Sequence, residues 1–134
     1  MAQLSVEIVT PEKRILSAKA DEVIAPGGRG LFGVRPGHSP FLSLMEAGPL
    51  ELREGAAKQV FFVAGGFIEV TNDKVLVLAD HAEPVKDIDV EAARKRLEAA
   101  QQALKGMSPE DTRFQVESAT VRRETARMGL ASRR

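Results

Sequence analysis

The sequence predicts an all-β sandwich followed by an α-helical hairpin, and two observations support this prediction. From residue 3 to about residue 80, apolar residues recur with a period of two between turn signals at roughly 8–12-residue intervals, which is typical of a sandwich or barrel of about 8–10 strands. After Pro84 the period becomes that of a helix. We therefore place a β-sandwich domain at residues 1–86 and a two-helix hairpin at residues 87–134.

The strands are predicted from apolar residues that alternate with polar ones. Residues 4–9 (LSVEIV) and residues 50–53 (LELR) alternate in this way, so each run should bury one face. The run at residues 75–78 (VLVL) is apolar throughout, which predicts a strand covered on both faces. Gly, Pro and Asn-Asp signals separate these runs, at residues 10–11, 26–28, 36–37, 47–49, 55, 65–66 and 71–73.

The helices are predicted from apolar residues spaced three and four apart. In the first helix these are Val90, Ala93, Leu97, Ala100 and Leu104. Either Asp87 or Asp89 can cap its start, and Lys105-Gly106 ends it.

The second helix is predicted to begin with Ser108 as its N-cap and Pro109 at the first helical position. Its predicted buried stripe is Phe114, Ser118, Val121, Thr125 and Met128.

The predicted seam between the helices is mostly Ala, Val, Ser and Thr, so it buries little apolar area and should be marginal alone. The hairpin is therefore either a fixed appendage of the sandwich or an element that moves at low cost. Residues 119–134 carry five Arg and one Glu. Such a basic end suits an acidic protein surface, although a solvated face would explain it equally well.

The composition excludes several classes of protein. The 134 residues contain no Cys, so disulfides, a thiolate nucleophile and a Cys-based zinc site are excluded. Balanced charge and few aromatic residues argue against a nucleic-acid partner. The longest apolar run, residues 60–64, is far below the roughly 20 residues that span a bilayer, and residues 1–10 do not resemble a signal peptide. We expect a soluble chain made in the cytoplasm, with no direct membrane insertion.

The two histidines are the candidates for catalysis. Neither His38 nor His81 belongs to a Ser-His-Asp arrangement or a G-x-S-x-G elbow, and two His without Cys make a poor metal set. Residues 28–33 (GRGLFG) match a dinucleotide fingerprint, but Pro36 and Pro40 exclude the helix that this motif requires. We predict no catalytic residue and no metal site, and we assign both histidines structural or interface roles.

Two motifs resemble the epsilon subunits of bacterial F-type ATP synthases. Residues 30–40 (GLFGVRPGHSP) are similar to the signature loop of that family, and residues 65–70 (GGFIEV) to its second motif. The opening VEIVTP, the run VLVLA and the helix start DID also fit, in order along the whole chain. The resemblance implies a β-sandwich with two C-terminal helices.

The resemblance also implies a non-catalytic rotor subunit of the central stalk, which binds the gamma subunit and the c-subunit ring while proton flow drives ATP synthesis. It implies a peripheral position on the cytoplasmic side of the bacterial inner membrane. The loop residues Leu31, Phe32, Arg35 and His38 are then the expected contacts with the c ring and gamma. Many relatives have an acidic residue where this chain has Leu31, so an apolar contact is expected to replace a polar one here.

For the hairpin, the resemblance implies that it can extend into the alpha/beta head and inhibit ATP hydrolysis. The expected contacts are Arg122, Arg123 and Arg127, which would meet an acidic segment of the beta subunit.

Some relatives bind ATP in the folded hairpin through a motif similar to [IL]-D-x-x-R-A. Here Ala92 replaces the arginine of that motif. The residues at the matching nucleotide-contact positions are Glu83, Asp89, Arg123 and Arg127. Without that arginine, the chain lacks a charge-assisted contact to the nucleotide worth roughly 1.5–3 kcal/mol. We therefore expect weak ATP binding or none, and we predict no cofactor.

Two other readings explain parts of the sequence. A freestanding adaptor or chaperone-like module would explain the sandwich and the basic helices without an ATP synthase. A small sandwich enzyme that uses His38 or His81 predicts turnover by the isolated chain. Co-purification with gamma in a membrane complex separates the rotor subunit from both.

Overall fold

The computed structural model describes residues 2–134 and divides into two compact units, one ending at Pro84 and one beginning at Val85. This division lies two residues before the boundary expected from the sequence. The first unit contains ten strands: β1 (Leu4–Val9), β2 (Arg14–Ala20), β3 (Glu22–Gly27), β4 (Gly30–Val34), β5 (Phe41–Leu44), β6 (Gly48–Glu54), β7 (Ala57–Ala64), β8 (Phe67–Thr71), β9 (Lys74–Leu78) and β10 (His81–Pro84).

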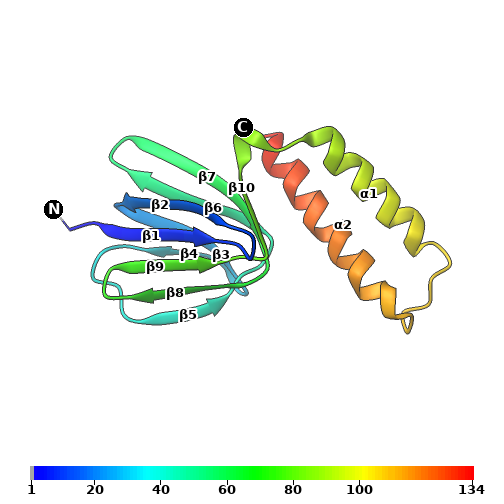
Figure 1. The fold of residues 1–134 in the computed structure, drawn as a ribbon, viewed down its shortest axis with the longest axis horizontal. Coiled ribbons are helices and arrows are strands. Elements are labelled where there is room, and N and C mark those ends of the chain that lie inside the picture. The colour runs from blue at the N-terminus through cyan, green and yellow to red at the C-terminus, as the bar shows by residue number, and fades with distance from the viewer. Residues whose placement is uncertain (1) are drawn as a thin grey trace. The chain divides into compact units, whose positions relative to one another are not determined.

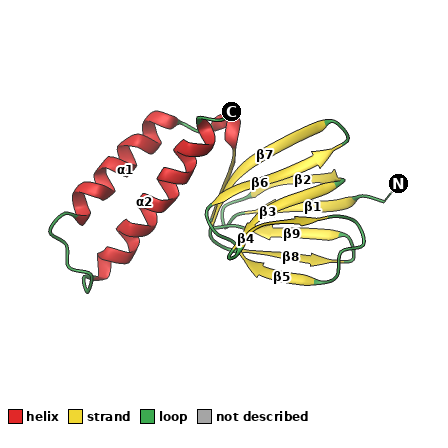
Figure 2. Ribbon diagram, turned by 180° about the vertical axis from the view of Figure 1, so that it is seen from behind, coloured by secondary structure: helices red, strands yellow, loops and turns green. Residues whose placement is uncertain are grey.

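The strands form two five-stranded sheets that pack face to face as a sandwich, which confirms the predicted fold class (Figures 1 and 2). One sheet has the order β2-β1-β9-β8-β5, and the other has the order β10-β7-β6-β3-β4. All neighbours within the sheets are antiparallel except β1 and β9, which are parallel. The first and ninth strands, which are far apart in the sequence, are therefore neighbours within the first sheet.

The core lies between the two sheets and follows the predicted alternation. Leu4, Val6 and Ile8 of β1 are almost completely buried, and so are Leu50 and Leu52 of β6. These side chains belong to one continuous cluster contributed by both sheets. In both strands these residues alternate with less buried ones, because successive side chains of a strand point to opposite faces of the sheet and only one face is buried.

Strand β9 differs from its prediction. Val75 and Val77 are buried, but Leu76 and Leu78 are only partly covered. The strand is therefore buried on one face, and the prediction of a strand covered on both faces is wrong. Its neighbours β1 and β8 explain the pattern, because Leu76 is paired in register with Glu7 and Glu69.

The second unit begins with a short 3₁₀ helix, η1 (Val85–Asp87), and contains α1 (Val90–Leu104) and α2 (Thr112–Ala131) packed side by side as the predicted hairpin (Figures 1 and 2). Asp89 is the N-cap of α1 and accepts a 3.0 Å hydrogen bond from the amide of Ala92. Gly106 follows the C-cap with φ +75°, the left-handed conformation expected after a helix.

Helix α2 begins later than predicted and buries different residues. Its N-cap is Asp111, because Ser108 closes a separate turn in which its carbonyl accepts from the Asp111 amide. Thr125 of the predicted stripe is exposed. The buried positions of α2 are Glu124, Arg127, Leu130 and Ala131.

The side chain of Arg134, after α2, forms hydrogen bonds with the backbone before α1. Nη1 of Arg134 donates to the carbonyl oxygens of Val85, Lys86 and Ile88 at 3.2, 3.3 and 2.9 Å. The guanidinium therefore satisfies carbonyls at the start of the unit, where η1 leads into α1.

Candidate functional site

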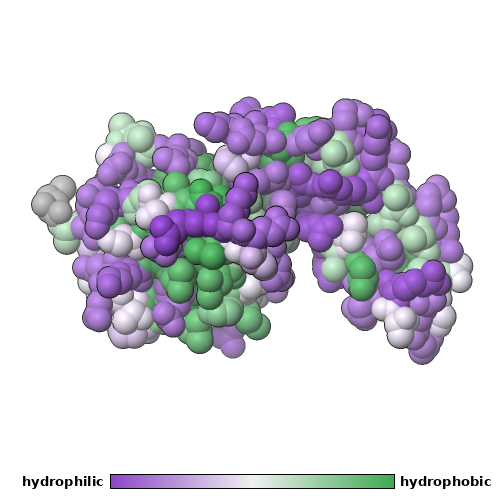
Figure 3. Space-filling view, in the orientation of Figure 1, coloured by the Kyte–Doolittle hydropathy of each residue, from purple (hydrophilic) through white to green (hydrophobic). Residues whose placement is uncertain are grey.

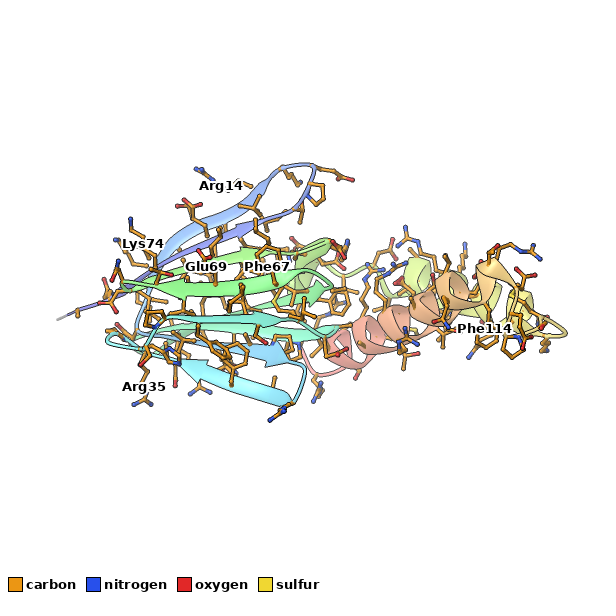
Figure 4. The ribbon with its side chains drawn as sticks, turned by 90° about the horizontal axis from the view of Figure 1, so that it is seen from below. Arg14, Arg35, Phe67, Glu69, Lys74 and Phe114 are labelled. Carbon is orange, nitrogen blue, oxygen red and sulfur yellow. The ribbon has the colours of Figure 1, made fainter. Side chains whose placement is uncertain are left out.

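The signature loop begins on β4, whose side chains alternate between two faces. Phe32 is partly buried against the sandwich core, whereas Leu31 is 62% exposed and the Arg35 side chain 76% exposed. Leu31 and Arg35 share the outer face but lie four residues apart, about 13 Å along an extended strand. Arg35 projects away from the sandwich, and its Nε lies 3.1 Å from Oε2 of Glu22 (Figure 4).

A tight turn follows β4. The His38 amide donates to the carbonyl of Arg35 at 3.1 Å, with Pro36 and Gly37 as the central residues. Gly37 has φ +87°, so the turn matches type II, which requires a positive φ at its third position. Asp73 accepts a 2.8 Å hydrogen bond from the Gly37 amide and thereby anchors the turn to the β8–β9 connection. Pro36 and Gly37 therefore form the turn that the sequence predicted at residues 36–37.

The imidazole of His38 is packed and hydrogen-bonded. Its ring contacts Phe41 edge-on at a centroid distance of 5.9 Å, and Phe41 in turn contacts Phe32 at 5.2 Å. Nδ1 of His38 lies 2.6 Å from the carbonyl oxygen of Ser39, which can only accept, so Nδ1 is the donor of this hydrogen bond. This geometry holds the ring against the sandwich. Within residues 2–134, no group of three His, Asp or Glu side chains is arranged to hold a metal ion.

Beside this loop, the structure exposes a group of large apolar side chains that sequence analysis missed. We define the apolar patch as Leu42, Leu44 and Phe67, which are 63%, 76% and 37% exposed and lie on one face of the sheet, because Leu44 is paired in register with Phe67. Phe41 is 40% exposed but lies on the other face of β5, where it contacts Phe32 and His38. It lies on β5 and on the neighbouring β8, and Figure 3 shows hydrophobic surface over this part of the sandwich. Strand β5 ends its sheet and pairs with β8 on one side. The apolar run that directly follows the loop (FLSL) resembles a buried strand in the sequence, so it gave no signal of this exposed surface.

The three hairpin arginines singled out from the sequence have different environments. Arg122 is exposed, the Arg123 side chain is 39% exposed, and the Arg127 side chain is 5% exposed. The folded hairpin therefore presents Arg122 to solvent, half-covers Arg123 and buries Arg127.

Glu124, which sequence analysis did not single out, contacts two of these arginines. Its side chain is fully buried. Oε1 lies 2.5 Å from Nη1 of Arg127 and 3.7 Å from Nη1 of Arg96 on α1, while Oε2 lies 3.1 Å from Nε of Arg123. We call these four residues the Glu124 cluster. A buried carboxylate with three guanidinium partners is neutralised and hydrogen-bonded, as burial of a charge requires.

The candidate nucleotide contacts have other partners in this structure. The Asp89 carboxylate caps α1, and Arg123 and Arg127 belong to the Glu124 cluster. Glu83 lies on β10 in the sandwich unit, where Oε1 is 3.2 Å from Nε2 of His81. His81 also contacts the ring of Phe62 at a centroid distance of 5.8 Å. Each of the two histidines is thus engaged with neighbouring side chains or backbone. No helix in the described part of the chain is long and apolar enough to cross a membrane.

Comparison with known protein families matches residues 3–85 to the family described as "ATP synthase, Delta/Epsilon chain, beta-sandwich domain". Among curated proteins, the chain is 70% identical over 132 residues to an ATP synthase epsilon chain of Myxococcus xanthus, covering 98% of this chain and 97% of that one. It is 48% identical over 130 residues to an epsilon chain of Anaeromyxobacter sp. strain K, covering 97% and 98%.

Solved structures share the fold. A chain of the Euglena gracilis mitochondrial ATP synthase aligns with a TM-score of 0.80 at 24% identity, covering all of this chain and 83% of that one. A chain from the central stalk and c ring of the Tetrahymena thermophila mitochondrial ATP synthase aligns with a TM-score of 0.62 at 18% identity, covering 95% and 97%. At these identities the likeness concerns the fold, and it includes both the sandwich and the helices of the hairpin.

Proposed function

This chain belongs to the ATP synthase epsilon chain family, and we propose that its sandwich binds the gamma subunit and the c-subunit ring while its hairpin inhibits ATP hydrolysis. As an epsilon chain, it is a non-catalytic central-stalk subunit of the rotor that couples proton flow to ATP synthesis. The observation that carries this conclusion is the 70% identity over nearly the whole length of a curated relative. The association with the synthase would place it peripherally on the cytoplasmic side of the bacterial inner membrane.

The apolar patch supports the docking of the sandwich. Leu42 and Leu44 are largely exposed on an edge strand, although burying each would stabilise a complex by about 1.5–3 kcal/mol. An edge strand with exposed leucines is otherwise an aggregation liability, so coverage by a partner is expected. We assign this patch to gamma, and we assign the outward-facing Leu31 and Arg35, with the neighbouring Phe32 and His38, to contacts with the c ring or gamma.

The basic second helix supports the inhibitory role of the hairpin. Arg122 is exposed in the folded hairpin, so an acidic segment of the alpha/beta head can attract it before the hairpin rearranges. Arg123 and Arg127 become available only after their contacts with Glu124 break. The inhibited state therefore requires a rearranged hairpin.

The occupied arginines also support the proposal that this hairpin works without bound ATP. Ala92 offers no guanidinium to a phosphate, and Arg123 and Arg127 already contact a carboxylate. Isothermal titration calorimetry of the isolated chain should show no saturable ATP binding below about 1 mM, which corresponds to roughly −4 kcal/mol. Binding in the micromolar range would contradict this proposal.

The test of the main function compares ATP hydrolysis by the assembled synthase containing the full chain with that containing a chain ending at Lys86. Removal of the hairpin should raise the rate several-fold, while the sandwich still co-purifies with gamma. Arg122→Glu should also raise the rate, and Arg113→Glu, at the other end of α2, is its matched control. An unchanged rate after truncation would remove the inhibitory role, and failure of the truncated chain to co-purify with gamma would contradict the proposal that the sandwich binds gamma.

A further inference from the structure

The Glu124 cluster contains more positive than negative charge at a position where burial makes charge costly. One carboxylate faces three guanidinium groups, from Arg96 on α1 and from Arg123 and Arg127 on α2. The carboxylate is fully buried, and the Arg127 side chain is 5% exposed. Removing one partner from a buried ion pair leaves an uncompensated charge, which is strongly unfavourable. Glu124 is therefore required to compensate the positive charge of its arginine partners, although glutamate is rarely fully buried.

The cluster also connects the two helices. Glu124 and Arg127 are three residues apart on α2, whereas Arg96 approaches the same carboxylate oxygen from α1 at 3.7 Å. The apolar part of the seam is small, with Ala93 and Ala100 as the buried residues of α1. Separation of the helices would thus expose little apolar surface but would remove one cationic partner of Glu124 and hydrate the others.

We propose that Glu124 is an internal acidic competitor, whose carboxylate holds Arg123 and Arg127 in the folded hairpin and releases them to an acidic partner surface only when the α1–α2 seam opens. This inference rests on the proposed inhibitory function and specifies its regulation. Arg123 and Arg127 share α2 with Glu124, so opening the seam removes Arg96 and exposes the remaining ion pairs to water. Exposed ion pairs within one helix are weak, so an acidic partner surface can then replace Glu124 as the partner of these arginines. The strength of the Glu124 contacts then sets the fraction of hairpins that are ready to inhibit.

The first test measures amide hydrogen exchange in the full chain. Glu124→Gln retains the shape of the side chain but removes its charge, so exchange in α1 and α2 should accelerate roughly tenfold or more. Amides of the sandwich serve as the internal reference. Glu98→Gln removes the same charge from an exposed ion pair with Arg94 on α1, and it should leave hairpin exchange nearly unchanged. Equal exchange in the two variants would overturn the proposal.

The second test measures ATP hydrolysis by the assembled synthase. If released arginines inhibit, Glu124→Gln should lower the rate below that of the unaltered complex, whereas truncation at Lys86 should raise it. A rate for Glu124→Gln that equals or exceeds the unaltered rate would overturn the competitor role, because Glu124 would then only maintain the fold of the hairpin. Glu124→Asp retains the charge and should restore both exchange and rate toward the unaltered values.

The two measurements separate failure of this inference from failure of the proposed function. If truncation leaves the rate unchanged, the inhibitory function fails and the competitor role fails with it, whatever the exchange data show. If truncation raises the rate but Glu124→Gln changes neither exchange nor rate, the inhibitory function stands and Glu124 is not its regulator.

Discussion

The carboxylate of Asp73 accepts a 2.8 Å hydrogen bond from the backbone amide of Gly37, thirty-six residues earlier in the chain. Asp73 lies in the two-residue turn between β8 and β9, where Asn72 and Asp73 have φ angles of +50° and +61°. These values match a type I′ turn, which Asn and Asp tolerate well. The shape of the signature loop is thus anchored by a side chain from a different hairpin.

Substitution of Asp73 should loosen the signature loop. Asp73→Gly removes the hydrogen bond without strain at positive φ, and the loss of a hydrogen bond to a charged group costs about 1.5–3 kcal/mol at most, less here because the site is exposed. Exchange of the Gly37 amide should accelerate, as measured by NMR. Asp73→Asn retains an oxygen acceptor and the turn preference, so it is the control. An unchanged Gly37 amide in the Gly variant would show that the bond does not hold the loop.

Substitution of Gly66 should destabilise the sandwich more than substitution of other turn glycines. Gly66 has φ +80°, and a Cβ there would lie 1.8 Å from the carbonyl oxygen of Leu78. Gly66→Ala should therefore cost about 2–5 kcal/mol, from backbone strain and overpacking together, in urea denaturation.

Two other glycines separate these effects. Gly55 has φ +58° with open space around it, so Gly55→Ala measures the strain alone, about 1–2 kcal/mol. Gly28 has open space and no positive φ, so Gly28→Ala should be nearly neutral. Similar losses in all three variants would contradict the steric argument.

The contribution of Asp21 to stability should depend on pH. The Gly55 amide, which donates to Oδ2 at 2.7 Å, and then the Gln3 side chain hold the pKa of Asp21 below its ordinary value of 3.8. A lowered folded-state pKa contributes stability that is present above the unfolded value and is lost as pH falls through the folded value. Asp21→Asn should therefore lower the urea midpoint at about pH 7, and the difference from the unaltered chain should shrink by about pH 2.5.

The control for this experiment is Glu12→Gln, which changes an exposed carboxylate in the β1–β2 turn. It should have little effect at either pH. If the Asp21→Asn difference were the same at both pH values, the carboxylate charge would not be its source.

Charge within the apolar patch should weaken binding to gamma without unfolding the sandwich. Leu44 is 76% exposed, so Leu44→Glu should change the free energy of unfolding by no more than about 0.5 kcal/mol. If the patch is buried against gamma, the same change should reduce affinity at least tenfold, or about 1.4 kcal/mol, in a titration of purified gamma. Gln59→Glu, which is exposed on β7 of the other sheet, is the matched control. Equal affinity of the two variants would place the gamma contact elsewhere.

The turn at Pro36-Gly37 and the caps of α1 could be predicted from the sequence because they depend on neighbouring residues, whereas Ser108 was wrongly predicted as the cap of α2. Gly37 and Gly106 adopt the positive φ angles that their turns require, and Asp89 caps α1 within three residues of its hydrogen-bond donor. The exposed patch could not be predicted, because Leu42 and Leu44 resemble any buried strand. Their exposure depends on the edge position of β5, which is a property of the whole sheet.

The sequence by itself determined that strands of a sandwich are followed by two helices, that β1 and β6 bury one face, and where α1 begins and ends, since each follows from a local period or a local stop signal. Only the tertiary structure decided that β1 pairs in parallel with β9, that Leu76 remains partly exposed, and that Glu124 is buried. The physical reason is that these outcomes depend on distant partners. The carboxylate of Glu124 is buried because arginines from both helices contact it, and a contact between two helices leaves no pattern in the local sequence.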